Sequence, residues 1–180
     1  MDLRMVKTRA QIKEAFLQLR EKLMPDKIKV KDICQVTMIN KTTFYNHYAD
    51  SNQLSEEIDN SMIDKILSVF AEKDKIFEDP KAYISGLLAA MEKESGALKR
   101  VFRGKREVMC VKLEERLRSF YEKEISDVDD KIKLSFAIGG FVRIVNDYVF
   151  GDVKYNVDQL AEATAHIIEA VLQKKAAVTA

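Results

Sequence analysis

Apolar residues recur along most of the chain at the spacing of an amphipathic helix, and no segment shows the strict alternation of a strand. The first helix has Thr8 as its N-cap and stops before Pro25. Its apolar face is formed by Ile12, Ala15, Phe16, Leu19 and Leu23. The pattern therefore predicts an all-α protein with about nine helices.

Capping residues and glycines place the other helices. The start signals are Asn40, Asp50 with Gln53 three residues later, the pair Asp79-Pro80, and Asn156 with Gln159. The stop signals are Gly96 and Gly151. Together they predict helices that begin at Asn40 and Asp50, a charged connection over residues 73–79, and later helices over residues 79–95, 97–103, 105–125, 129–150 and 157–174.

Composition narrows the class of protein. A third of the 180 residues are charged and 47% are apolar, a mix typical of globular proteins. The longest charge-free stretches have nine residues, whereas a membrane helix needs about 20, so we expect no transmembrane segment. The N-terminus shows no apolar signal core, and Cys34 and Cys110 form neither a disulfide framework nor a zinc motif. We therefore expect a cytoplasmic protein without a metal or cofactor.

The charge is unevenly distributed, although its total is only +1. Residues 1–48 contain ten Lys and Arg against five Asp and Glu, a balance of +5, and the other 132 residues have a balance of −4. A basic N-terminal part on a mildly acidic remainder indicates two parts with different tasks. Chance unevenness on solvated helix faces would give the same numbers.

Residues 30–48 have the spacing of a helix-turn-helix motif, namely a short helix, a turn and a second short helix. Ile33, Val36, Ile39 and Phe44 would brace the second helix from its inner side, and Asn40 caps its N-terminus. The outer side carries donors and acceptors that suit phosphates and base edges in a major groove: Lys41, Thr42, Thr43, Tyr45, Asn46 and His47. The spacing alone is equally typical of a helical hairpin that only packs.

The stretch from Thr8 to Leu54 resembles the DNA-binding domain of the TetR family of bacterial transcription regulators. The resemblance is carried by Val30 with Ile33 in the bracing helix, by the run Phe44-Tyr45-Asn46-His47-Tyr48, and by Leu54 in the next helix. It implies a three-helix DNA-binding domain over residues 1–50 and a helical effector-binding and dimerisation domain over residues 51–180.

The resemblance also assigns roles to single residues. Lys41, Tyr45 and His47 are expected to contact phosphates, while Thr42, Thr43 and Asn46 are candidates for contacts with base edges. Tyr48 is expected to be a core aromatic. A metal role for His47 or His166 is not expected, because two isolated histidines give no ligand spacing.

Several positions depart from the family pattern. The turn has Thr37-Met38 where relatives commonly have a small residue followed by Gly, so Met38 must tolerate a backbone that suits glycine. Lys29 stands where a Ser or Thr usually caps the bracing helix, and Asp32 in the first turn offsets part of that loss. Ser51 replaces a Lys that contacts phosphate in relatives.

The C-terminal part is expected to form a homodimer through residues 129–150 and 157–174, as the last two helices do in relatives. The first of these is apolar over more than one face, which predicts burial, and Gly139-Gly140 lies inside it. Aromatic, Met and polar residues between the helices are candidates for an effector pocket, although aromatic and Met residues at this spacing are more often part of a plain core. The candidates are Tyr83, Met91, Phe102, Met109, Phe120, Phe136, Arg143 and Tyr148.

The predicted function is a ligand-responsive regulator, by the family's common mode a repressor, which binds a pseudo-palindromic DNA operator as a homodimer. An alternative keeps the DNA-binding part but has the C-terminal part dock a co-activator or co-repressor protein, with no small molecule. An enzyme is not expected, because the sequence has no Gly-rich phosphate loop, metal cluster or nucleophile motif.

Overall fold

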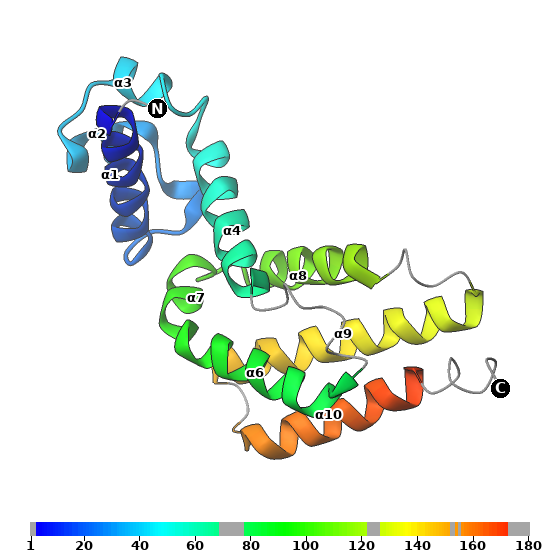
Figure 1. Cartoon of the computed structure of the whole chain (residues 1–180). Helices are drawn as coiled ribbons and strands as arrows, with labels where there is room; N and C mark the ends of the chain where they lie inside the picture. The colour runs from blue at the N-terminus through cyan, green and yellow to red at the C-terminus, as the bar shows by residue number, and fades with distance from the viewer. Residues whose placement is uncertain (1–2, 69–77, 122–126, 152–153, 155, 173–180) are drawn as a thin grey trace. The chain divides into compact units, whose positions relative to one another are not determined.

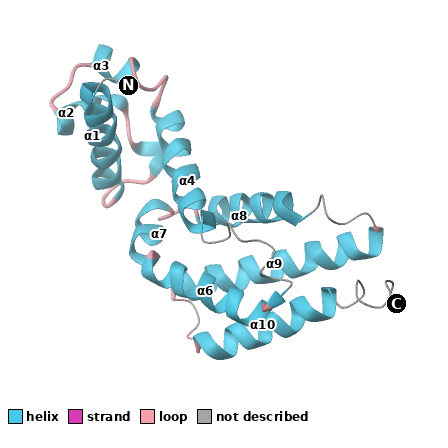
Figure 2. Cartoon of the chain, viewed as in Figure 1, coloured by secondary structure: helices cyan, strands magenta, loops and turns pink. Residues whose placement is uncertain are grey.

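The computed structural model of the chain describes residues 3–68, 78–121, 127–151, 154 and 156–172. Over these residues it consists of nine α-helices and one short 3-10 helix, and it contains no strand (Figures 1 and 2). In chain order the elements are α1 (Leu3–Arg20), η1 (Pro25–Lys27), α2 (Val30–Thr37), α3 (Lys41–Tyr45), α4 (Ser51–Leu67), α6 (Pro80–Lys93), α7 (Ser95–Val101), α8 (Arg106–Tyr121), α9 (Val128–Phe150) and α10 (Val157–Leu172). The all-α prediction is confirmed.

The helices form two compact units. The first, which we call the head, comprises Met1–Met62 and Ala97–Lys105, and the second, which we call the body, comprises Ile63–Gly96 and Arg106–Ala180. Helices α4 and α7 each contribute residues to both units. The division into functional domains at residues 50 and 51 stays a prediction, because compactness does not assign function.

The core of the head is built from one face of each of its helices. α1 buries Ile12, Ala15 and Phe16, as the apolar spacing predicts, while Leu23 is 39% exposed. α2 contributes Ile33 and α3 contributes Phe44, and both are fully buried. Full burial of a side chain of this size contributes about 1.5–3 kcal/mol, so α3 is held mainly by its inner face.

The predicted helix starts are mostly confirmed by their capping bonds. The Asn40 side chain accepts a bond from the backbone N–H of Thr43 at 2.7 Å. At α4 the Asp50 side chain accepts from Gln53 N–H at 2.8 Å, and the Gln53 side chain accepts from Ala49 N–H at 2.6 Å. The Asp79 side chain caps α6 and the Asn156 side chain caps α10. Gly151 ends α9 with φ 76°, a left-handed conformation that glycine adopts without steric cost.

Two boundary predictions were wrong. Thr8 lies inside α1, and its hydroxyl donates to the carbonyl of Arg4 at 2.9 Å instead of capping a helix start. Gly96 lies inside α7 and does not end α6, which stops at Lys93 with Glu94 as its C-cap. Residues 73–77 of the predicted connection lie outside the described residues, as do 122–125 and 173–174 of two predicted helices.

The body contains α6, α8, α9 and α10, and α9 and α10 run side by side in opposite directions (Figure 1). α9 turns Ile138, Val142, Val145, Asn146 and Val149 into the body core. The burial expected for α9 included a homodimer interface, and it is incomplete in the single chain. Ile132 and Phe136 are 64% and 83% exposed, because no other described helix covers that face.

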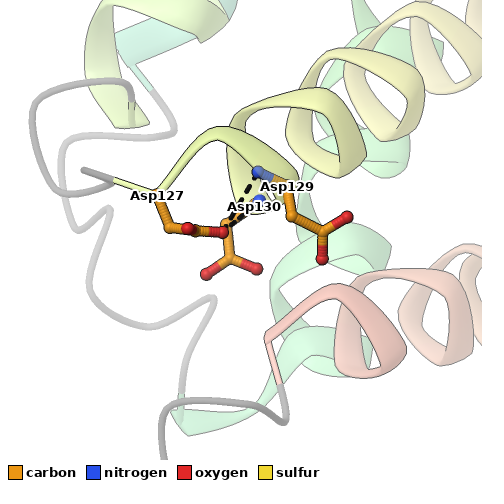
Figure 3. Close-up of side chains that lie close together, drawn as sticks. All are labelled: Asp127, Asp129 and Asp130. Atoms are coloured by element: carbon orange, nitrogen blue, oxygen red, sulfur yellow. Dashed lines mark hydrogen bonds between the residues drawn. The ribbon is translucent and has the colours of Figure 1, made fainter.

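The acidic first turn of α9 is occupied by helix capping and ion pairing (Figure 3). The Asp127 carboxylate accepts from the backbone N–H groups of Asp129 and Asp130 at 3.0 and 3.3 Å. Lys133 pairs with Asp129 and lies 3.7 Å from Asp130. These contacts account for the clustering of the three carboxylates without any ion. Among the described helices, none has both the length and the apolar character needed to cross a membrane.

Candidate nucleic-acid interface

The predicted helix-turn-helix is present as α2, a turn over residues 38–40, and α3. Met38 ends α2 with φ 55° and ψ 28°, and within the described residues it is the one non-glycine residue with positive φ. Its side chain is 94% exposed. The turn therefore has the backbone that suits glycine, and this chain accommodates a methionine there at a steric cost of about 1–2 kcal/mol.

Met38→Gly should stabilise the head by about 0.5–1 kcal/mol, because relief of the left-handed strain outweighs the larger entropy of glycine in the unfolded chain. Met38→Ala is the matched control. Alanine keeps the strain and removes a side chain that makes little contact, so its effect should lie within about 0.5 kcal/mol. Urea unfolding followed by circular dichroism measures both variants. If both substitutions changed the free energy of unfolding by the same amount, the left-handed backbone at Met38 would not be strained.

The start of α2 lacks a side-chain acceptor, but Asp32 compensates. Its carboxylate accepts a hydrogen bond from the backbone N–H of Lys29 at 3.0 Å. A carboxylate in the first turn also interacts favourably with the helix dipole. The bracing helix therefore keeps an anchored start although Lys29 replaces the usual cap.

The outer side of α3 presents polar groups to solvent. Lys41, Thr42, Tyr45 and Asn46 are exposed, whereas Thr43 and His47 are half-buried. None of the ion pairs among the described residues includes Lys41. The Thr43 hydroxyl donates to the Asn40 side-chain oxygen at 2.9 Å, so it already serves the cap. The six predicted residues therefore lie together on α3 and directly after it. The Thr43 hydroxyl is already engaged by its hydrogen bond to Asn40.

The inner side of the same segment consists of Phe44 and Tyr48. Phe44 is fully buried, and Tyr48 is 2% exposed, which confirms the expectation of a core aromatic. Their ring centroids lie 5.9 Å apart, and the Phe44 and Tyr45 rings meet edge to face at 5.7 Å. This buried pair fixes which face of α3 points outward.

A polar cluster of side chains from α1 and α4 holds Tyr48 in place, and no pattern in the sequence indicated this cluster. Arg9 from α1 donates to the Tyr48 hydroxyl and to Glu57 of α4, each at 3.1 Å, and Lys13 pairs with Glu57 at 2.7 Å. Burial and the nearby carboxylate raise the pKa of Tyr48 to about 12. Burial opposes ionisation of Glu57, but its bonds to Arg9 and Lys13 still hold its pKa below the ordinary value.

Residues 97–105, predicted as part of the C-terminal domain, belong to the head. Arg20 is buried and donates to the carbonyl of Arg103. Arg100 pairs with Glu14 of α1 at 2.8 Å. These contacts join groups more than eighty residues apart in the chain, so sequence spacing could not indicate them.

A further contact of this segment with the head is buried. The Lys105 ammonium donates to the Asp59 carboxylate at 2.6 Å and to the Ser55 hydroxyl at 2.9 Å. The side chains of Lys105 and Asp59 are only 12% and 5% exposed. Lys105, which follows α7 in the chain, is therefore bound to α4 within the head.

The charge of the head keeps the predicted sign. Its residues contain fourteen Lys and Arg and nine Asp and Glu, a balance of +5, which leaves sixteen against twenty in the body, or −4. Several of the basic groups are engaged within the head, among them Arg9, Lys13 and Lys105. The positive charge available to a partner is therefore smaller than the total, and exposed Lys41 counts for more.

Comparison with solved structures finds matches over nearly the whole chain. A TetR transcriptional regulator from Streptococcus agalactiae shares 20% identity over 92% of this chain and 95% of its own, with a TM-score of 0.63. The dihydroxyacetone kinase operon activator DhaS shares 16% identity over 93% of this chain and 97% of its own, with a TM-score of 0.57. The chain has the TetR fold. No family model matches the sequence, and no curated protein matches it closely enough to be significant.

In this TetR-like fold the predicted effector-pocket residues do not form one group. Phe102 belongs to the head, while Phe136 and the side chain of Arg143 are 83% and 74% exposed. The Tyr83 and Tyr121 hydroxyls lie 3.4 Å apart, and burial together with the nearby Glu92 raises the pKa of Tyr148. Met109 is fully buried, and Phe120 is half-buried. The pocket assignment stays a prediction.

Of the candidate pocket residues, Met91 lines an apolar cavity of the body with a volume of about 10 Å³. The cavity is lined by Ile66, Leu67, Leu87, Met91, Leu113, Leu117, Phe141, Val142 and Val145. A volume of this size holds about one water molecule, whereas pockets for drug-sized ligands have volumes of roughly 300–1,000 Å³. An effector would have to open this core to enter it.

Proposed function

We propose that this chain is a DNA-binding transcription regulator of the TetR type, which acts as a homodimer on a pseudo-palindromic operator and is not an enzyme. One observation carries the proposal. α3 is fixed by buried Phe44 and Tyr48 so that Lys41, Thr42, Tyr45 and Asn46 face outward, on a unit with a charge balance of +5 and within a TetR-like fold. This arrangement suits insertion of α3 into a major groove.

Selection of bound fragments from random double-stranded DNA tests the proposal. A homodimer with one α3 per half-site should enrich an inverted repeat, with half-sites about one helical turn apart or a multiple of it. Binding should also weaken steeply as salt rises, because contacts to phosphates release counterions. Failure to enrich any inverted repeat would remove the proposal.

The double substitution Lys41→Ala with Tyr45→Phe should weaken operator binding about 10- to 100-fold, through loss of two contacts to phosphate. The loss should be similar on most sequences, and the slope of log affinity against log salt should fall by about 0.9. Lys93→Ala, which removes one exposed positive charge from the body, is the matched control. Fluorescence anisotropy over a salt series measures both. Unchanged affinity of the double variant would refute the contact assignment.

We propose α9 and α10 as the homodimer surface, in keeping with their exposed apolar residues. Ile132 and Phe136 on α9 and Ile167 on α10 are 64%, 83% and 49% exposed. Two copies of both helices would bury these side chains in an isologous interface. Binding of an effector within the body would change the separation of the two α3 helices and thereby the DNA affinity, and repression is the mode we propose.

A second candidate function keeps the DNA-binding head but has a protein partner, and not a small molecule, as the signal. The small volume of the cavity among the described residues of the body favours it, because that cavity is too small to hold a metabolite as it stands. Thermal-shift screening separates the two. A metabolite that raises the melting temperature at millimolar concentration supports the effector, and a chain that responds only to a co-purifying protein supports the partner.

A further inference from the structure

Glu57 on α4 lies at the centre of a chain of bonded side chains that ends at Tyr48. Its carboxylate accepts two hydrogen bonds from the Arg9 guanidinium, one of them from Nε at 3.1 Å, and pairs with Lys13 Nζ at 2.7 Å. Arg9 Nε also donates to the Tyr48 hydroxyl at 3.1 Å, and the guanidinium carbon lies 5.1 Å from the centre of the Tyr48 ring. Two parallel bonds to a carboxylate fix the plane of an arginine, so Glu57 determines where Arg9 holds Tyr48.

Tyr48 is connected in turn to residues that we expect to contact DNA. It lies three residues beyond the end of α3, and its backbone N–H donates to the carbonyl of Phe44 at 3.0 Å. The N–H groups of Asn46 and His47 bond the same helical turn, to the carbonyls of Thr42 at 3.0 Å and Phe44 at 2.9 Å. Because Tyr48 is part of this bonded turn and only 2% exposed, a shift of its ring would move the backbone of Asn46 and His47.

The two ends of α3 are held by different contacts. At the start of the helix the Asn40 side chain caps the N–H of Thr43, and in its middle Phe44 is fully buried. Beyond Phe44 the next buried side chain along the chain is Tyr48. The start of α3 is therefore set by local bonds, whereas the position of its end depends on the side chains from α1 and α4 that hold Tyr48.

We propose that Glu57 is a positioning residue for DNA recognition, which acts through Arg9 and Tyr48 to keep the end of α3 in the orientation that discriminates one DNA sequence from another. The inference rests on the proposed DNA-binding function and adds to it a residue outside the outward face of α3. Functional side chains need to be placed to within about 0.5 Å, and base edges carry the sequence information. Loss of Glu57 should therefore reduce discrimination more than it reduces binding to DNA in general.

A role in stability alone would have a different signature. A variant that is partly unfolded has fewer competent molecules, so its apparent affinity for every DNA falls by the same factor. A displaced end of α3 instead lowers the affinity for the preferred sequence, while non-specific binding persists because it comes from phosphate contacts. The ratio of specific to non-specific affinity, which we call the discrimination ratio, separates the two roles.

The first test measures the discrimination ratio of full-length Glu57→Gln by fluorescence anisotropy, on a fragment enriched by selection and on the same fragment with scrambled half-sites. Glutamine keeps the size of the side chain but removes the charge that holds Arg9 and Lys13, so the ratio should fall about 10-fold. Glu14→Gln is the matched control, because it removes an equal charge and an ion pair, formed with Arg100 at 2.8 Å, from the same unit. The control should keep the ratio of the wild type.

Double-mutant cycles test the path through Tyr48. Tyr48→Phe removes the hydroxyl and keeps the buried ring, so it should lower the discrimination ratio about 3-fold, and adding it to Glu57→Gln should cost little more. In affinity for the enriched fragment, Tyr45→Phe should also cost less in the Glu57→Gln background, because the displaced contact is already weakened. Lys41→Ala, at the capped start of α3, should be additive with Glu57→Gln.

The outcomes separate this inference from the proposed function. A wild-type chain that enriches no DNA fragment overturns the proposed function and the inference with it. A wild-type chain that discriminates, while Glu57→Gln keeps the same ratio or loses affinity equally on both fragments, overturns the inference alone. So does a fall in the ratio that is additive with both tyrosine substitutions. Should Glu57→Gln fail to fold, as circular dichroism would show, Tyr48→Phe carries the same test, because it leaves every charge in place. A lower ratio in Glu57→Gln, absent in Glu14→Gln and coupled to Tyr48 and Tyr45, supports the inference.

Discussion

Asp59→Leu should destabilise the head by about 3–5 kcal/mol, because it leaves the Lys105 ammonium buried without its carboxylate. Lys105 Nζ lies 2.6 Å from Asp59 Oδ1, and only 12% and 5% of the two side chains are exposed. Breaking a buried pair from one side costs far more than the pair contributes over an apolar replacement. Amide hydrogen exchange of α2 and α3 measures the stability of the head directly.

The paired substitution Asp59→Leu with Lys105→Met separates charge from packing. It should recover most of the loss, because no uncompensated charge remains in the head. Asp26→Leu is the surface control, since Asp26 and Lys27 form an ion pair with 67% and 72% of their side chains exposed, and its effect should stay below about 1 kcal/mol. A loss below 1 kcal/mol for Asp59→Leu alone would show that the pair does not hold the head together.

Local signals in the sequence predicted much of the fold, because helix ends depend on residues close in the chain. Asn40, Asp50 with Gln53, and Asp79 cap helices as their spacing indicates, and Gly151 ends one. Gly96 was misleading for a physical reason. A glycine favours a helix end only where the backbone turns left-handed, and within the described residues positive φ among glycines is confined to Gly104 and Gly151.

Long-range contacts in the head escaped prediction for a different reason. Arg9 and Glu57 are 48 residues apart, and Lys105 and Asp59 are 46 apart. Any of the thirty basic residues could pair with any of the twenty-nine acidic ones, so spacing carries no information about these ties. For the same reason, the sequence pattern did not place residues 97–105 in the head. There, Arg103, Arg100 and Lys105 contact residues that are distant in the chain.

The candidate interface was partly predictable, because both faces of α3 are encoded within a few residues. The helical pattern predicts that Phe44 is on the buried side and the resemblance implies a core role for Tyr48, and the structure places both in the core. The engagement of the Thr43 hydroxyl by Asn40 was not predicted, since it depends on the cap geometry. The exposure of Ile132 and Phe136 on α9 was not predicted either, because a helix that is apolar on several sides gives no sign of which side the single chain leaves uncovered.

Phe44→Ala should destabilise the head by about 3–5 kcal/mol and abolish specific DNA binding, because α3 is held chiefly by this ring. Phe44 is fully buried and contacts the rings of both Tyr45 and Tyr48. With five residues, α3 cannot hold its shape without tertiary packing. Removing the ring leaves a cavity and frees the helix, so the outward residues lose their common direction.

Two matched variants distinguish loss of position from loss of contact. Phe44→Leu fills most of the volume and should cost about 1 kcal/mol while specific binding persists. Tyr45→Phe removes one hydroxyl on the exposed side, so hydrogen exchange of the head should stay unchanged while DNA affinity falls about 10-fold. If Phe44→Ala kept both the exchange protection of α3 and the affinity, the helix would have to be fixed from its outer side, and the orientation argued for the interface would be wrong.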